Sequence, residues 1–160
     1  MRDVRIIQLN GGLVAKVDEC DYEMASKFKW SLLNVGGVLY ARRTIRSGDK
    51  QKTVLLHREI MQPRNGMVVD HINGDGLDCT RENMRIVTRA QNNINKRVKR
   101  VSRTGVKGVR KHSMCNKFSA EIKPPNGKRI YLGLFETVEA AASAYKAASE
   151  IHHGEFRREK

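Results

Sequence analysis

The middle of this 160-residue chain spaces an acid, a histidine and two asparagines in a way that could support metal-assisted hydrolysis. Asp70 and His71 are adjacent, Asn83 follows the histidine by twelve residues, and Asn92 follows nine residues later. Carboxylate and amide oxygens are hard ligands that suit Mg²⁺ or Mn²⁺. A histidine, whose ordinary pKa is about 6.5, can take a proton from water near pH 7. The alternative is a loop in which Asp70 only caps a turn and His71 is a surface residue, which leaves the spacing to Asn92 unexplained.

The elements that must position these residues form a strand–loop–strand–helix series. Val68 and Val69 lead as a strand into the acid and the histidine, and a loop rich in Gly, Asn and Asp follows. A short apolar strand then returns at 84–87, and Thr88 opens a helix. A further short helix is expected just before the series, from His57 to Met61.

With these residues in this order, the sequence resembles the HNH nuclease family, whose fold is the ββα-metal finger. Phage and intron-encoded homing endonucleases of this family carry asparagine in place of the last histidine, as this chain does at Asn92. The resemblance implies that Asp70 and Asn92 hold one divalent metal, Mg²⁺ or Mn²⁺, and that His71 is the general base. It also implies that Asn83 bonds across the loop to hold the strands and the histidine. The implied reaction is hydrolysis of a DNA phosphodiester.

Three residues near this series have open roles. Arg85 and Arg89 either clamp the scissile phosphate or are simply solvated. His57 could pack, contact DNA or assist the site, and packing is the preferred interpretation.

The charge of the chain indicates its class of partner. There are 31 Lys+Arg against 17 Asp+Glu, a formal net charge of +14, which favours nucleic acid or an anionic membrane. The longest apolar runs have four or five residues, far below the ~20 that span a bilayer. The first residues do not form a signal peptide. We therefore expect no membrane partner and a cytoplasmic location, in a bacterial or phage-infected host cell.

The basic residues concentrate in one stretch. No acid occurs between Glu82 and Glu121, and eleven basic residues lie there. The densest part, 96–103, separates two segments that each look folded, so we interpret it as a basic linker that follows a phosphate backbone. The expected backbone contacts are Lys96, Arg97, Lys99 and Arg100.

The N-terminal region, 1–56, is predicted to be rich in strands. Alternating apolar residues and the turn signal at 10–12 favour strands at 4–9, 13–17, 38–45 and 52–56, with a short helix at 21–28. Trp30 and Tyr40 are expected in the core because both lie in apolar, alternating contexts.

A second pattern begins at Gly105. Strands are expected at 105–111, 117–123 and 128–135, with a hairpin turn at 124–127, and Thr137 should cap a helix that runs to about His152. This segment resembles the plant ethylene-response-factor domain (the APETALA-two type), in which a three-stranded sheet lies in the major groove and a helix backs it. That resemblance covers about 104–155, and carried over by position it implies the DNA readers Arg110, Glu121, Lys123, Arg129 and Tyr131. Alternation within the strands places Glu121, Lys123, Arg129 and Tyr131 on one face, which Arg110 joins if the first strand pairs beside them. Such a charged face suits groove binding, and the alternative is an ordinary solvated face.

Taken together, the sequence predicts an α+β protein. Its expected parts are a β-rich region at 1–56, an HNH ββα-metal region at 57–97, a basic linker at 98–104 and an ethylene-response-factor-like DNA-binding domain at 105–160. The expected function is site-directed cleavage of double-stranded DNA with a divalent metal and no small-molecule substrate. The alternative is a non-catalytic, sequence-specific DNA-binding regulator that keeps the HNH scaffold. The target sequence, the choice between a nick and a double-strand break, and the oligomeric state are open.

Overall fold

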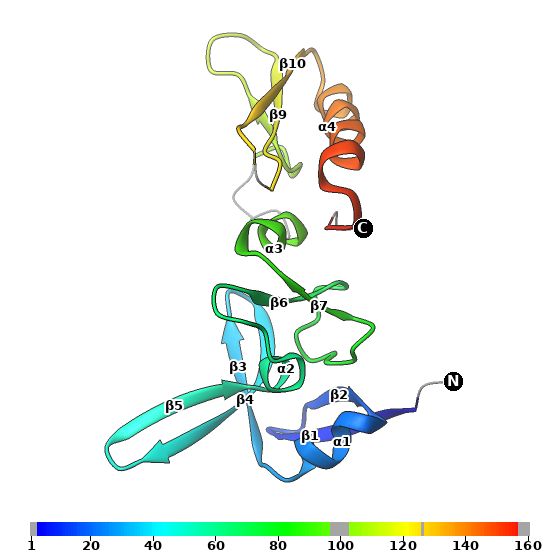
Figure 1. Ribbon diagram of the computed structural model, residues 1–160. Helices are drawn as coiled ribbons and strands as arrows, with labels where there is room; N and C mark the ends of the chain where they lie inside the picture. Colours follow the sequence, from blue (N-terminus) through cyan, green and yellow to red (C-terminus); the bar gives the residue numbers. More distant parts are fainter. Residues whose placement is uncertain (1–2, 97–102, 126, 157–160) are drawn as a thin grey trace. The chain divides into compact units, whose positions relative to one another are not determined.

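The computed structural model describes residues 3–96, 103–125 and 127–156. The chain divides into two compact units, 1–89 and 90–160. Both units mix strands and helices, so the α+β prediction is confirmed (Figure 1). No helix in the described ranges is long and apolar enough to cross a membrane.

The first unit is built on a five-stranded sheet with the order β2-β1-β3-β4-β5. β1 and β3 are parallel, and the other neighbours are antiparallel. Helix α1 follows β2 directly and begins two residues before the predicted helix at 21–28. The sequence analysis did not delimit β3, which starts at Trp30, right after the helix. The bounds are β1 Val4–Asn10, β2 Val14–Asp18, α1 Glu19–Ser26, β3 Trp30–Val35, β4 Val38–Ser47 and β5 Lys50–Leu55.

Helix α2 (Leu56–Met61) and the two-stranded sheet of β6 (Val68–His71) and β7 (Met84–Val87) complete the first unit. One hydrophobic core joins the N-terminal sheet to these elements. Trp30 is fully buried in this core, as predicted. Its other buried members come from both parts: Ile7, Leu9, Ala15, Val17, Ala25, Ala41, Leu56, Ile60, Val69, Cys79 and Met84. The N-terminal strands therefore support the strands that carry Asp70 and His71.

The second unit contains helix α3 (Arg89–Asn95), which begins at the boundary residue, and a three-stranded antiparallel sheet backed by α4. Val109, Ala120 and Ala141 form the centre of its core, with Tyr145 packed against them. The first strand is shorter than predicted, because a turn with Gly105 and Gly108 at positive φ occupies the segment before it. The bounds are β8 Val109–Lys111, β9 Phe118–Ile122, β10 Ile130–Phe135, α4 Val138–His153 and a 3-10 turn Gly154–Phe156.

One local prediction for the second unit is confirmed, and one close approach was not predicted from the sequence. The Thr137 side chain caps α4 by accepting a hydrogen bond from the Ala140 backbone N–H at 3.1 Å. Gly108 is required by a close approach, since a Cβ there would collide with the Tyr145 ring and the Glu121 carbonyl oxygen. Tyr145 thus packs in the core of the unit.

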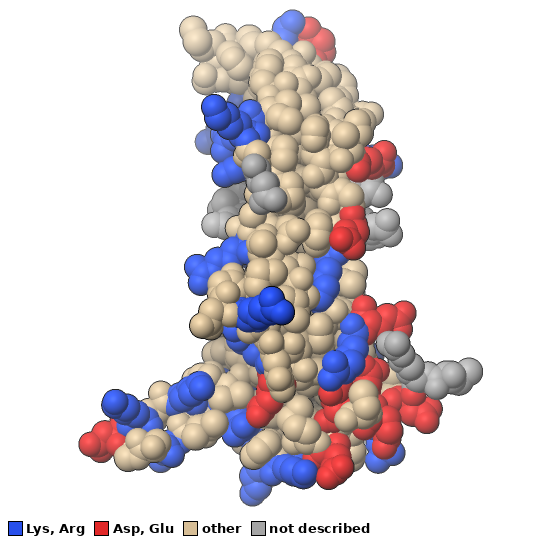
Figure 2. Space-filling view, in the orientation of Figure 1, with Lys and Arg blue, Asp and Glu red and all other residues tan. Residues whose placement is uncertain are grey.

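The charged side chains of the first unit are unevenly distributed. The hairpin of β4 and β5 carries Lys and Arg side chains with an acidic one near its end, whereas acidic side chains gather over the region of α1 and β2 (Figure 2). The hairpin and the acidic region therefore present opposite charge to solvent.

Candidate active site

Asp70 and His71 end strand β6, and both are buried, with 4% and 5% of their surface exposed. Strand β6 pairs antiparallel with β7, so that Asp70 lies opposite Arg85 and His71 opposite Met84. The apolar Val69 beside them belongs to the hydrophobic core. The strand therefore fixes both side chains from a rigid support rather than from a mobile loop.

The Asp70 carboxylate is held by Arg85. Nε of Arg85 donates to Oδ2 of Asp70 at 2.9 Å, and its terminal NH2 nitrogen lies 2.8 Å from the same oxygen. The Arg85 side chain is only 16% exposed. Arg85 was predicted as a DNA contact, and the structure places it against the candidate metal ligand.

His71 lies in a cluster of three rings with Tyr40 and His57. The ring centroids are 5.1 Å apart for His57 and His71, 5.2 Å for Tyr40 and His57, and 5.9 Å for Tyr40 and His71. Nδ1 of His57 is buried and has no hydrogen-bond partner among the residues described. The preferred interpretation of His57, a packing role, agrees with this geometry.

Burial controls the charge of this ring cluster. Burial, with smaller contributions from the nearby His71 and Arg58, lowers the pKa of His57 to about 3. Burial also lowers the pKa of His71, although the carboxylates of Asp70, Asp75 and Asp78 oppose this shift. His71 is therefore a neutral imidazole near pH 7, the form that accepts a proton.

Tyr40 is the residue of this cluster that sequence reasoning did not connect with the site. It was expected in the core, and it is half-buried with its ring against both histidines. Burial raises the pKa of Tyr40, with a smaller contribution from the charge of Asp70. A Cβ at Gly76 would lie 2.7 Å from two Tyr40 ring carbons, so the loop after His71 also packs on this ring. The strand register that brings Tyr40 here has no signal in the sequence.

Asn83 ties together the loop between β6 and β7. Its Oδ1 accepts from the Asn73 backbone N–H at 3.0 Å, and its Nδ2 donates to the Asp78 carbonyl oxygen at 2.8 Å. Its own carbonyl oxygen accepts from the Ile72 N–H at 2.8 Å. These bonds span the loop directly after His71.

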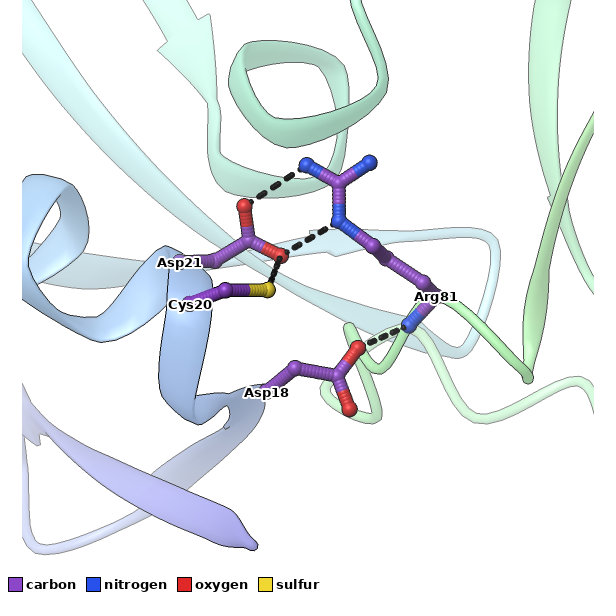
Figure 3. A network of polar contacts seen from close by, with 4 residues as sticks. All are labelled: Asp18, Cys20, Asp21 and Arg81. Carbon is purple, nitrogen blue, oxygen red and sulfur yellow. Dashed lines mark hydrogen bonds and ion pairs between the residues drawn. The ribbon is translucent and has the colours of Figure 1, made fainter. Parts of the chain in front are cut away.

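The same loop is anchored to the N-terminal region by a network that the sequence did not reveal (Figure 3). The Arg81 guanidinium donates to both carboxylate oxygens of Asp21, each at 2.8 Å, and the Arg81 backbone N–H donates to Oδ2 of Asp18 at 2.8 Å. Cys20 donates to Asp21 at 3.7 Å. Because Asp18 and Asp21 are buried, the contact stabilises the loop against α1 and the end of β2.

Asn92, the other candidate metal ligand, is half-buried on α3 in the second unit. Lys107 holds the end of this helix, since its Nζ donates to the carbonyl oxygens of Asn93 at 3.2 Å and Lys96 at 3.3 Å, and also to that of Ile94. Among the expected DNA contacts near α3, Arg89 and Lys96 are exposed. The remaining ones, Arg97, Lys99 and Arg100, lie outside the described residues.

Three of the expected DNA readers, Arg110, Glu121 and Tyr131, share a face of the second-unit sheet. Arg110 and Arg129 both form ion pairs with Oε1 of Glu121, at 3.0 and 2.7 Å. Tyr131 lies opposite Glu121 in the neighbouring strand and is 64% exposed. Lys123 is also exposed. Glu121 therefore orients two guanidinium groups on the open face of the sheet, away from α4.

The donors predicted from the spacing, a carboxylate and an amide, are of the kind that suits a hard metal ion rather than zinc. Within the described ranges, no three His, Cys, Asp or Glu side chains form a group that could hold a metal. Asp70 supplies a buried carboxylate, and the partner proposed by spacing is an amide oxygen. Oxygen ligands of this kind suit Mg²⁺ or Mn²⁺, whereas structural zinc sites use Cys and His.

Comparisons with known proteins identify the family of the segment that carries these residues. The model of the HNH endonuclease family matches residues 56–94, which include Asp70, His71, Asn83 and Asn92. An uncharacterised HNH endonuclease of Acanthamoeba polyphaga mimivirus is 31% identical over 146 residues, covering 91% of this chain and 73% of the relative. The dehydration-responsive element-binding protein 2A of Arabidopsis thaliana is 43% identical over 58 residues, which are 36% of this chain and 17% of that protein. No solved structure matches the chain at a significant level. The matched finger and the similarity along most of the chain show that this protein belongs to the HNH endonuclease family.

Proposed function

We propose that this HNH protein is a site-directed, metal-dependent endonuclease that cleaves double-stranded DNA. The observation that carries the proposal is the buried Asp70–His71 pair at the end of β6, where the imidazole is neutral near pH 7 and the carboxylate is held in place. In the proposal, His71 takes the proton of the attacking water, and Asn83 keeps the loop and the histidine in position. These residues support a hydrolytic reaction rather than simple binding.

In the same proposal, Asp70 and Asn92 hold one Mg²⁺ or Mn²⁺ ion. The bound ion supplies positive charge to the phosphate and to the leaving oxygen as negative charge develops on them. Arg85 orients the Asp70 carboxylate, because both of its contacts reach one oxygen, Oδ2. Asn92 would supply its amide oxygen, and Lys107 stabilises the end of the helix that carries it.

Recognition of the target is assigned to the second unit, as an ethylene-response-factor-like domain at 105–160. Its support is the partial similarity to the plant element-binding protein and the exposed face formed by Arg110, Glu121, Lys123, Arg129 and Tyr131. Arginine can bond guanine bidentately, and the Glu121 ion pairs hold two arginines ready for such contacts. The basic linker at 98–104, with Lys99 and Arg100, and the preceding Lys96 and Arg97 would follow the phosphate backbone.

The metal requirement tests the nuclease proposal. Protein freed of metal with a chelator should not nick supercoiled plasmid DNA, and added Mg²⁺ or Mn²⁺ should restore nicking. Asp70→Asn keeps the size of the side chain but removes its charge, so it should raise the metal concentration needed by at least an order of magnitude. Asp75→Asn is the matched control, because it removes one charge from an exposed position of the same loop.

Two results would contradict the proposal. Nicking that persists without metal would exclude the metal-dependent reaction, and equal metal requirements for Asp70→Asn and Asp75→Asn would exclude Asp70 as the ligand. No nicking by wild-type protein under any metal, together with specific binding, would favour the non-catalytic regulator. Mapped cut positions that spread in an Arg129→Gln, Tyr131→Ala variant would support the assignment of the reading face, and unchanged positions would oppose it.

A further inference from the structure

The outer part of the β4–β5 hairpin has no packing role in the first unit. Every residue from Thr44 to Thr53 is exposed, whereas Ala41, further back on β4, is fully buried. The two strands pair with each other over this whole stretch, from the Thr44–Thr53 pair to the Ser47–Lys50 pair (Figure 1). A two-stranded ribbon that buries neither face gains little stability from its own contacts. Its length therefore indicates a role outside the fold.

The two faces of this ribbon differ in chemistry. Because residues that pair across antiparallel strands point to the same side, the Thr44–Thr53 and Arg46–Gln51 pairs form one face, made only of hydrogen-bonding side chains. The opposite face carries Ile45, Ser47, Lys50 and Lys52. The ribbon has three basic residues and one acid, Asp49 at the turn, and no aromatic residue. This composition matches a polyanion rather than an apolar protein surface.

The hydrogen-bonding face continues back along β4 to the candidate active site. Alternate residues on a strand share a face, so Tyr40, Arg42, Thr44 and Arg46 form one row. Tyr40 lies at the start of this row, with its ring centroid 5.9 Å from that of His71. Arg42 comes next, and its buried Nε has no hydrogen-bond partner among the residues described. Its half-buried guanidinium group is the positive charge that follows Tyr40 in this row, and a guanidinium group suits a phosphate.

We propose that the β4–β5 hairpin is a DNA-binding arm that lies in the major groove on one side of the cleavage site. The major groove admits a two-stranded β-ribbon. Arg42 would bind a backbone phosphate between the active site and the ribbon, and Arg46 and Gln51 would face the base edges. Arg46 lies six positions after Tyr40, and a strand of that length spans about 20 Å, or roughly six base pairs. The inference rests on the proposed DNA endonuclease and gives its N-terminal unit a share in target binding.

Binding to duplex DNA tests the arm without using cleavage as the readout. The full chain carrying Arg46→Gln, Lys50→Gln and Lys52→Gln should bind a fluorescent 40-base-pair duplex at least tenfold more weakly than wild type in anisotropy titrations. The loss of three positive charges at the DNA surface should also lower the slope of log affinity against log salt, by at most about three. Asp49→Asn should bind more tightly, a gain that misfolding does not produce.

The matched control removes the same charge elsewhere in the first unit. Lys16→Gln, Lys27→Gln and Lys29→Gln are all at exposed positions outside the hairpin. This control should keep most of the affinity and most of the salt slope. Equal losses of DNA affinity in the two triple variants would mean that only net charge matters and would overturn the proposal of a DNA-binding arm. Unchanged binding by the hairpin variant would overturn it as well. Because none of these readouts requires cleavage, they separate a failure of the arm from a failure of the nuclease proposal.

Discussion

The buried His57 should make the stability of the first unit depend on pH. Its pKa is lowered from the usual 6.5 to about 3 in the folded protein. A histidine that stays neutral when folded but takes a proton when unfolded stabilises the fold above pH 6.5, and that contribution is lost as the pH falls. The loss continues down to about pH 3, where the folded protein also takes the proton.

The expected magnitude follows from this shift. At pH 5, which is 1.5 units below the ordinary pKa, His57 alone should destabilise the folded state by about 2 kcal/mol relative to pH 8, since one unit corresponds to about 1.4 kcal/mol. The substitution His57→Phe keeps a ring against Tyr40 and His71 but cannot take a proton. Between pH 8 and pH 5, the variant should therefore lose about 2 kcal/mol less stability than wild type.

Urea unfolding followed by tryptophan fluorescence measures this difference. Trp30 is the only tryptophan of the chain and is fully buried in the core of the first unit, so its signal reports that unit. A His152→Gln variant in the second unit serves as the control and should follow wild type. Equal pH dependence of wild type and His57→Phe would refute the reasoning about the buried ring cluster.

Three further substitutions test how the units are held together internally. Gly108→Ala should destabilise the second unit by about 1–3 kcal/mol in thermal unfolding followed by circular dichroism, because the new Cβ collides with the Tyr145 ring at a positive φ. Thr137→Ala removes the cap of α4 and should destabilise that unit by about 1 kcal/mol by the same measurement, whereas Thr137→Ser keeps the hydroxyl and should retain most of the stability. Asp21→Asn should destabilise the first unit by about 1 kcal/mol in urea unfolding, since the Arg81 side chain that it pairs with is 48% exposed and screened by water. If the double variant Asp21→Asn, Arg81→Met loses as much free energy of unfolding as the sum of the two single variants, the two side chains do not stabilise each other, which would contradict this contact.

Local sequence patterns were sufficient to predict several elements of the fold. Apolar alternation and the turn at 124–127 placed the second-unit strands within a few residues, and the cap at Thr137 placed the start of α4. These features depend on neighbours in the chain, so the sequence records them directly. The helix α1 was shifted by two residues because β2 runs into it without a loop, and no residue type marks such a junction.

The long-range contacts of the candidate site had no such signal. Two ion pairs join residues far apart in the sequence: Arg85 and Asp70 are 15 residues apart, and Arg81 and Asp21 are 60 residues apart. The row from Tyr40 to Arg46 depends on which side of the sheet β4 presents. A change of one residue in register would have turned Tyr40 away from the histidines. The spacing of Asp70, His71, Asn83 and Asn92 could be read from the sequence because these residues lie on consecutive elements.

The most direct test of the account is the single-turnover rate of plasmid nicking by a His71→Ala variant, measured with saturating protein and Mg²⁺. The account predicts that the rate falls by about two to four orders of magnitude, as expected for loss of a general base. Circular dichroism and anisotropy titrations should show that the variant folds and binds the same DNA. A folded, DNA-binding His71→Ala protein that nicks at the wild-type rate would contradict the claim that His71 activates the attacking water.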